Sequence, residues 1–110
     1  MRLTCAGRLV VDDIGDAATF RTRLLGWFDP AFRRCRGVLL HPCRSIHTLW
    51  MPHAIDVVFL SAEREVCAVV KQLARNRRAS CRDAAYVLEL PAGMAAAQGI
   101  KPGQVIDFER

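Results

Sequence analysis

Ile55-Asp56-Val57-Val58-Phe59-Leu60 is the stretch that decides the fold, because its β-branched and aromatic side chains are typical of a strand. A polar turn over 61–65 follows it. Val66-Cys67-Ala68-Val69-Val70 is then a second run of the same character, and we expect the two runs to pair. This pair would lie within a predominantly antiparallel sheet.

The segment before this stretch also predicts a strand. Residues 46–50 alternate in polarity, so that Ile46 faces one side and His47 the other. Pro52-His53 can form a tight turn, which predicts a hairpin between 46–50 and 55–60. In that register Asp56 lies opposite Leu49, one pair from His47, where its carboxylate could orient the imidazole.

Working outward, the remaining pattern predicts further short strands and two helices. A helix is expected from an N-cap at Asp16 to an end near Gly26. A second, short helix is expected to begin at Pro91 and to end at a left-handed Gly99, with Ile100 packing back on Ala95. The other predicted elements are strands at 9–11, 37–41, 86–90 and 105–108, a loop over 74–83, and a type II turn over 101–104.

These elements together predict one α+β domain over residues 1–110. Its predominantly antiparallel strands would form either a small, partly closed barrel or a two-layer sheet, with one N-terminal helix and one short C-terminal helix. With 110 residues, of which 52% are hydrophobic, the chain needs neither a metal nor a disulfide to fold. We expect no cofactor.

Composition excludes several classes of protein. No apolar run approaches the roughly 20 residues that span a bilayer, and Arg8 and Asp12-Asp13 interrupt any signal peptide, so a cytoplasmic location without membrane association is expected. The five cysteines contain no C-x-x-C pair, which argues against a disulfide framework, a zinc ribbon and a thioredoxin-like redox pair. The net charge of +5 could attract an anionic partner but does not identify one.

Two segments resemble a known family. The first is Pro42-Cys43-Arg44-Ser45-Ile46-His47-Thr48-Leu49-Trp50-Met51, continuing through 55–60, and the second is Val87-Leu88-Glu89-Leu90-Pro91-Ala92-Gly93, followed by Gly99-Ile100-Lys101-Pro102-Gly103. In this order they resemble the bacterial domain-of-unknown-function family 192 (DUF192), and Thr22-Arg23-Leu24-Leu25-Gly26 is similar to its helix, more loosely. Two places depart from the family pattern. Gln104 stands where the family usually has Asp, and Leu73-Ala74-Arg75 replaces a proline-containing stretch. The resemblance implies a compact, β-rich fold and no particular reaction.

The candidate ligand or partner site surrounds the Ser-Ile-His-Thr signature at 45–48 and comprises Cys43, His47, Trp50, Met51, His53 and Asp56. Cysteine with histidine can bind zinc or act as a nucleophile with its base. A polar residue between apolar strand residues is more often a hydrogen-bonded structural fixture, so we assign neither a metal site nor a catalytic residue. Glu89, between two leucines, is expected to face solvent, and Cys67 is expected in the core.

A second candidate is the basic stretch Lys71, Arg75, Arg77, Arg78 and Arg82, which could neutralise phosphates. It contains no interleaved aromatic side chain, so a solvated loop is favoured over a nucleic-acid site.

The sequence therefore favours a non-enzymatic accessory or protein-interaction module, with Trp27, Trp50, Met51 and His53 as partner anchors and a monomer as the expected state. The alternatives are a small-ligand-binding protein or enzyme that uses His47 with Cys43 or Asp56, and weak nucleic-acid binding through residues 71–82.

Overall fold

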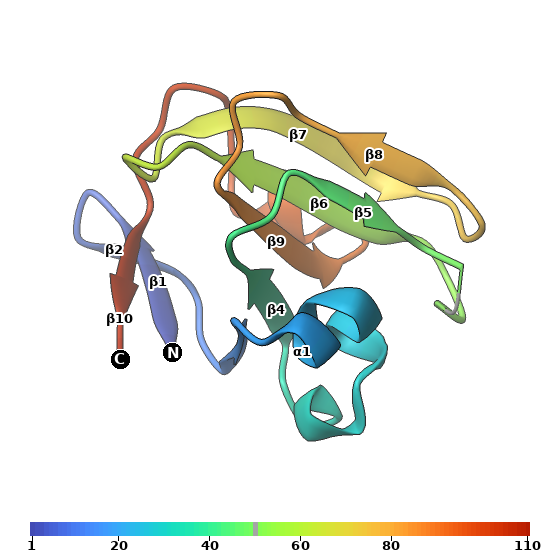
Figure 1. Ribbon diagram of the computed structural model, residues 1–110. Coiled ribbons are helices and arrows are strands. Elements are labelled where there is room, and N and C mark those ends of the chain that lie inside the picture. The colour runs from blue at the N-terminus through green and yellow to red at the C-terminus, as the bar shows by residue number, and fades with distance from the viewer. Residues whose placement is uncertain (50) are drawn as a thin grey trace.

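The computed structural model of the protein describes residues 1–49 and 51–110. Its largest element is a five-stranded sheet in the order β3, β4, β9, β6, β7 (Figure 1). β3 and β4 run parallel, and every other neighbouring pair in this sheet is antiparallel, so the mostly antiparallel, β-rich fold is confirmed. The strands span Ile14–Ala17 (β3), Gly37–Leu40 (β4), Ile55–Leu60 (β6), Val66–Leu73 (β7) and Tyr86–Pro91 (β9).

β6 lies inside this sheet, with β7 on one edge and β9 on the other. The predicted pairing of 55–60 with 66–70 is confirmed, with Val58 opposite Val69. All six residues of β6 are buried, because side chains cover both faces of the sheet and neighbouring strands satisfy both edges. The polar residue in this strand, Asp56, therefore needs buried partners.

Two smaller sheets complete the β structure. β1 (Arg2–Cys5) lies between β2 (Arg8–Val11) and β10 (Asp107–Glu109), which brings the two chain ends side by side (Figure 1). β5 (Ser45–His47) pairs only with β8 (Arg78–Ser80) among the described strands. The described strands form three separate sheets and no closed barrel, so the barrel alternative is wrong.

The predicted hairpin between 46–50 and 55–60 is wrong, and so is the loop over 74–83. β5 and β8 are antiparallel, with Ile46 opposite Ala79. Both edges of β6 are taken by β7 and β9, which leaves no free edge for β5. β8 is a polar strand like β5, and the Thr48 hydroxyl extends the contact by donating to the carbonyl of Ala74 at 2.7 Å.

The helices are short and begin later than the pattern predicted. α1 spans Phe20–Leu25 and is capped by Thr19, whose hydroxyl accepts from the Thr22 N–H. Asp16 does not cap it, because Asp16 belongs to β3 and pairs with β4. Two 3-10 turns follow, η1 (Gly26–Phe28) and η2 (Pro30–Phe32).

The C-terminal helix α2 covers Met94–Ala97, so its predicted start at Pro91 is wrong. Pro91 instead ends β9, opposite Ile55 of β6. The predicted end is confirmed, because Gly99 is left-handed and the Ile100 N–H donates to the Ala95 carbonyl at 2.9 Å. The predicted turn over 101–104 is confirmed by Gly103 at φ 94° and a bond from the Gln104 N–H to the Lys101 carbonyl.

Alternating residues of the five-stranded sheet form two apolar clusters, one on each face. The first contains Leu39, Val58 and Leu88, covered by the β1–β2–β10 sheet and α2. The second contains Val57 and Val87, with Ile46 of β5 packed on it. Cys67, expected in the core, is only half-buried, because β7 lies at the edge of the sheet.

Asp56 connects α2 and β7 to β6. It is fully buried, and its two carboxylate oxygens accept the backbone N–H groups of Gln72 at 2.8 Å and Ala95 at 2.9 Å. Asp56 lies opposite Leu90 of β9, and the register that placed it opposite Leu49 is wrong. It acts as a structural fixture that satisfies one N–H of β7 and one of α2.

Replacing Asp56 with Ala should lower the free energy of unfolding by about 3 kcal/mol, because two buried N–H groups lose their acceptor. Urea denaturation followed by circular dichroism measures this. Asp107→Ala, at an exposed position of β10, is the matched control and should change stability by less than about 0.5 kcal/mol. Equal effects of the two substitutions would contradict the structural role of Asp56.

Candidate functional site

The structure places Glu89 in the interior, which corrects the prediction that it faces solvent. Its exposed fraction is only 3%. It lies in β9 between Val38 of β4 and Val57 of β6, so neighbouring strands cover both edges of β9 at this point. Val87, Leu88 and Leu90 surround Glu89 with apolar residues on both faces of the strand. A strand that is apolar on both faces is typically buried, and this signal could have placed Glu89 inside.

The end of α1 is shaped around the Glu89 carboxyl. The Trp27 N–H donates to Oε1 at 3.0 Å. Gly26 ends the helix at φ 57°, and a Cβ there would lie 2.8 Å from the same oxygen. Glycine at position 26 therefore provides both the left-handed turn and the room for the carboxyl.

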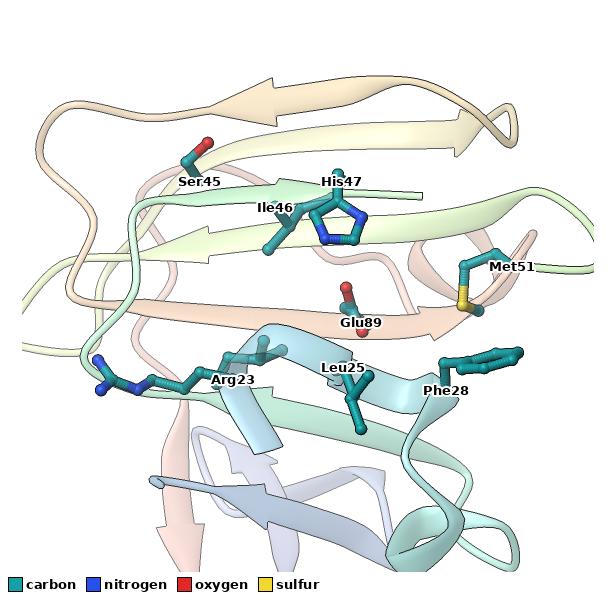
Figure 2. Close-up of a pocket in the computed structure, with 10 residues that line it drawn as sticks. Arg23, Leu25, Phe28, Ser45, Ile46, His47, Met51 and Glu89 are labelled. Atoms are coloured by element: carbon teal, nitrogen blue, oxygen red, sulfur yellow. The ribbon is translucent and has the colours of Figure 1, made fainter. Parts of the chain in front are cut away.

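A cavity of about 150 Å³ opens above Glu89, between α1 and β5. Ile46 and His47 point down from β5 toward the Glu89 carboxyl, whereas Arg23 extends away from it (Figure 2). The Arg23 guanidinium donates to the Pro42 carbonyl at 3.1 Å. The lining residues are Arg23, Leu25, Gly26, Phe28, Leu40, Ser45, Ile46, His47, Met51 and Glu89.

His47 is held over the cavity by its neighbours in the chain. The Leu49 N–H donates to its Nδ1 over a long 3.4 Å. The next residue, Thr48, is fully buried and accepts the Arg77 N–H at 2.9 Å. These contacts fix the strand end that carries the imidazole.

Burial raises the pKa of Glu89 to about 7, and the single N–H bond from Trp27 offsets only part of this rise. Two ion pairs join His41 and Arg110 to Asp16, and neither involves Glu89. Glu89 is therefore a buried carboxyl without a cationic partner in the described part of the chain. Groups with such perturbed pKa values gather at functional sites.

An apolar hollow of about 490 Å³ adjoins the cavity. The two share Leu25, Phe28 and Met51, so they form one continuous surface with a polar end and an apolar end. The Phe28 side chain is 51% exposed at their junction. The residues that line the hollow are Leu25, Trp27, Phe28, Asp29, Pro30, Arg33, Met51, Pro52 and His53.

The structure brings together part of the candidate site predicted from sequence. His47 lines the cavity, Met51 lines both spaces, and His53 lines the hollow. Asp56 is bound to backbone N–H groups of β7 and α2. Trp50 lies outside the described residues.

Cys43 is not among the residues that line the cavity. Its thiol donates to the Ser45 carbonyl at 3.2 Å, and burial raises its pKa. A nucleophilic cysteine needs a lowered pKa, so the shift runs against that role. Among the described residues, no three His, Cys, Asp or Glu side chains gather closely enough to hold a metal ion.

Sequence analysis missed a second polar cluster, formed by Asp16, His41 and Arg110 near the chain ends. Asp16 Oδ1 binds the His41 ring, and its Oδ2 accepts from Arg110. Burial raises the pKa of Asp16, but the bonds from Arg110 and His41 outweigh this and hold the pKa below its ordinary value. No local pattern could predict this cluster, because its members are as far apart in sequence as residues 16 and 110.

The five residues of the predicted basic patch are exposed, on β7, on β8 and in the segments beside β8. They are Lys71, Arg75, Arg77, Arg78 and Arg82. The exposure of these five side chains is consistent both with a solvated surface and with phosphate binding. Weak nucleic-acid binding therefore stays a prediction. No described helix is long and apolar enough to span a membrane.

The fold and the cavity define a class: a small, β-rich domain with a buried acidic residue beneath a partly open cavity. The chain belongs to the DUF192 family, described as "Uncharacterized ACR, COG1430", whose model matches residues 3–108. It is 29% identical to the UPF0127 protein PF1050 of Pyrococcus furiosus over 111 aligned positions, covering 94% of this chain and 93% of that protein.

Two crystal structures share the fold. A protein of unknown function from Novosphingobium aromaticivorans DSM 12444 superposes with a TM-score of 0.80 at 20% identity, over 97% of this chain and 82% of that one. A protein of Sinorhizobium meliloti 1021 named a "putative transcription regulator" gives 0.78 at 22% identity, over 96% of this chain and 89% of that one. At these identities the likeness concerns the fold alone.

The three segments that carry the family resemblance meet at the cavity. Ser45, Ile46 and His47 come from the first segment, Glu89 from the second, and Gly26 from the helix segment. Their convergence could not be read from the sequence, because it depends on α1 and β5 packing on the face of the sheet toward which Glu89 of β9 points.

The raised pKa of Glu89 predicts a loss of stability as the pH rises. The folded protein keeps this proton up to about pH 7, whereas the unfolded chain releases it near pH 4.5, so the unfolded state binds fewer protons between these values. The free energy of unfolding should therefore fall by about 3 kcal/mol across this window, relative to Glu89→Gln.

Urea denaturation of both proteins from pH 4 to pH 8 measures the difference. Glu63→Gln, which removes an exposed carboxyl, is the control and should show no such window. A constant difference between wild type and Glu89→Gln would contradict the raised pKa.

Proposed function

We propose that the protein binds a small molecule in the cavity between α1 and β5, with Glu89 as the anchor. The observation that carries this proposal is Glu89 itself, a 97% buried carboxyl whose one recorded hydrogen bond among the described residues comes from Trp27. An unpaired buried carboxyl costs stability, so a fold that keeps one beneath an opening has the character of a binding site.

The surroundings support binding and do not specify a reaction. His47 and Glu89 face the same cavity from opposite sides, which is the arrangement of an acid and a base (Figure 2). However, Cys43 has a raised pKa, and the carboxylate of Asp56 is bound to backbone N–H groups elsewhere. The enzyme version that uses His47 with either residue is therefore not the function we propose.

A fragment screen by ¹H–¹⁵N NMR tests ligand binding. Fragments of up to about ten heavy atoms should shift the amide signals of Gly26, Trp27, His47 and Glu89, with dissociation constants from about 0.1 to about 1 mM. His47→Ala should weaken this binding at least about fivefold, because the imidazole forms the upper wall of the cavity.

His53→Ala is the matched control, since His53 lines the hollow and not the cavity. It should leave the binding of short polar fragments unchanged. Fragments that shift other parts of the protein, or no fragment binding at all, would rule out a ligand site above Glu89.

Protein interaction is the second candidate function, favoured by the half-exposed Phe28 beside the hollow. Trp27, Met51 and His53 line this hollow, and large side chains such as Trp27 and Met51 are typical anchors. We expect the protein to be cytoplasmic and monomeric.

A photo-crosslinking side chain introduced at Phe28 should link a defined cellular protein. The control is the same side chain at Leu9, which is 45% exposed on β2. Equal labelling from both positions would show nonspecific contact and contradict an interface at the hollow.

A further inference from the structure

We infer that the ligand is an amphiphilic primary amine, whose ammonium group binds the Glu89 carboxylate in the cavity and whose apolar part lies over Phe28 in the hollow. This inference rests on the proposed ligand site and adds the chemical class of its ligand.

The first reason is charge. Glu89 is buried, and no cation of the described residues pairs with it. A buried carboxylate is stabilised by an opposite charge within hydrogen-bond distance, and an ammonium group with three donors supplies both the charge and the bonds. Oε1 already accepts from Trp27, which leaves Oε2 as the acceptor for the ligand.

The second reason is the position of the arginine that lines the cavity. Arg23 lines the cavity, but its guanidinium is bound to the carbonyl of Pro42 and points away from Glu89 (Figure 2). An anionic ligand would therefore meet a carboxyl at the base of the cavity with no guanidinium beside it. This arrangement favours a cationic head group over a carboxylate or a phosphate.

The third reason is shape. The cavity of about 150 Å³ accommodates a head group, and the hollow of about 490 Å³ is within the usual range for sites that bind a whole small molecule. Their shared walls, Leu25, Phe28 and Met51, are apolar. Phe28 is half-exposed where the two spaces meet, so an alkyl or aromatic tail could contact it.

Several titratable or charged groups face these two spaces or lie close to Glu89, and they could contribute to any pH dependence. They are Arg23 from α1, Asp29 and Arg33 beside η2, Cys43 and His47 from the β5 segment, and His53 beside the hollow. His47 faces the same cavity as Glu89, so a positive charge on its imidazole would repel an amine. The test therefore includes a variant for each of the two residues.

The experiment compares three probes that share a phenyl ring and a two-carbon spacer, by NMR titration of the whole chain: phenethylamine, 2-phenylethanol and 3-phenylpropionate. The amine should bind at least about tenfold more tightly than the alcohol, and the carboxylate most weakly. Affinity for the amine should rise about tenfold from pH 6 to pH 8, because the ionised fraction of Glu89 rises by that factor.

Glu89→Gln should abolish both the preference for the amine and the pH dependence. The substitution keeps the shape of the side chain and removes a buried charge, so the variant should remain folded. His47→Gln should retain both properties, and Glu63→Gln, which removes an exposed charge, should behave as wild type.

The outcomes separate this inference from the proposed function. Equal binding of amine and alcohol at the cavity, or tighter binding as the pH falls, would overturn the amine and leave a ligand site in place. The inference would also be overturned by a pH dependence that disappears in His47→Gln and persists in Glu89→Gln. If neither these probes nor the fragments shift residues around Glu89, both proposals fail.

Discussion

Complete enclosure of β6 is the constraint on which the rest of the structure depends. Its six residues are buried, both its edges are paired, and both its faces are covered. A strand in that position cannot leave a polar group unsatisfied, which is why Asp56 holds one N–H of β7 and one of α2. It also cannot accept a further strand, so the Ser45–His47 segment pairs with β8 and lies across one face of the sheet, with Ile46 on the second apolar cluster.

The candidate site depends on the position of β5 outside the five-stranded sheet. β5 forms a wall opposite α1, and the space between them is the cavity above Glu89. Glu89 therefore has different surroundings from Asp56, the other buried carboxyl of this sheet. Asp56 has both oxygens bound by backbone N–H groups, whereas Glu89 has one such bond and an opening. Two buried carboxyls on neighbouring strands thus have separate roles, one in stability and one in the proposed recognition.

Membership of the DUF192 family concerns the fold of the chain, whereas the proposed ligand concerns its cavity. The DUF192 match covers residues 3–108, and the related crystal structures share the fold without assigning a reaction. The segments that carry the family resemblance contribute Gly26, His47 and Glu89 to one cavity. These three positions could therefore be compared across the family. We expect a glycine at position 26 to leave room for the carboxyl, an imidazole at position 47 above the cavity, and a carboxyl at position 89 below it.

The sequence by itself determined the strand character of 55–60 and 66–70, their pairing, the Schellman end at Gly99 and the turn at 101–104, because these features depend on neighbouring residues. It also indicated the family through its motifs, and it named as candidate site residues His47, Met51 and His53, which line the cavity or the hollow. Only the tertiary structure decided that Glu89 is buried, that β5 pairs with β8, that Thr19 and not Asp16 caps α1, and that Asp16 joins His41 and Arg110. The physical reason is that alternation along a strand shows which residues share a face, whereas burial of that face depends on which distant segments cover it.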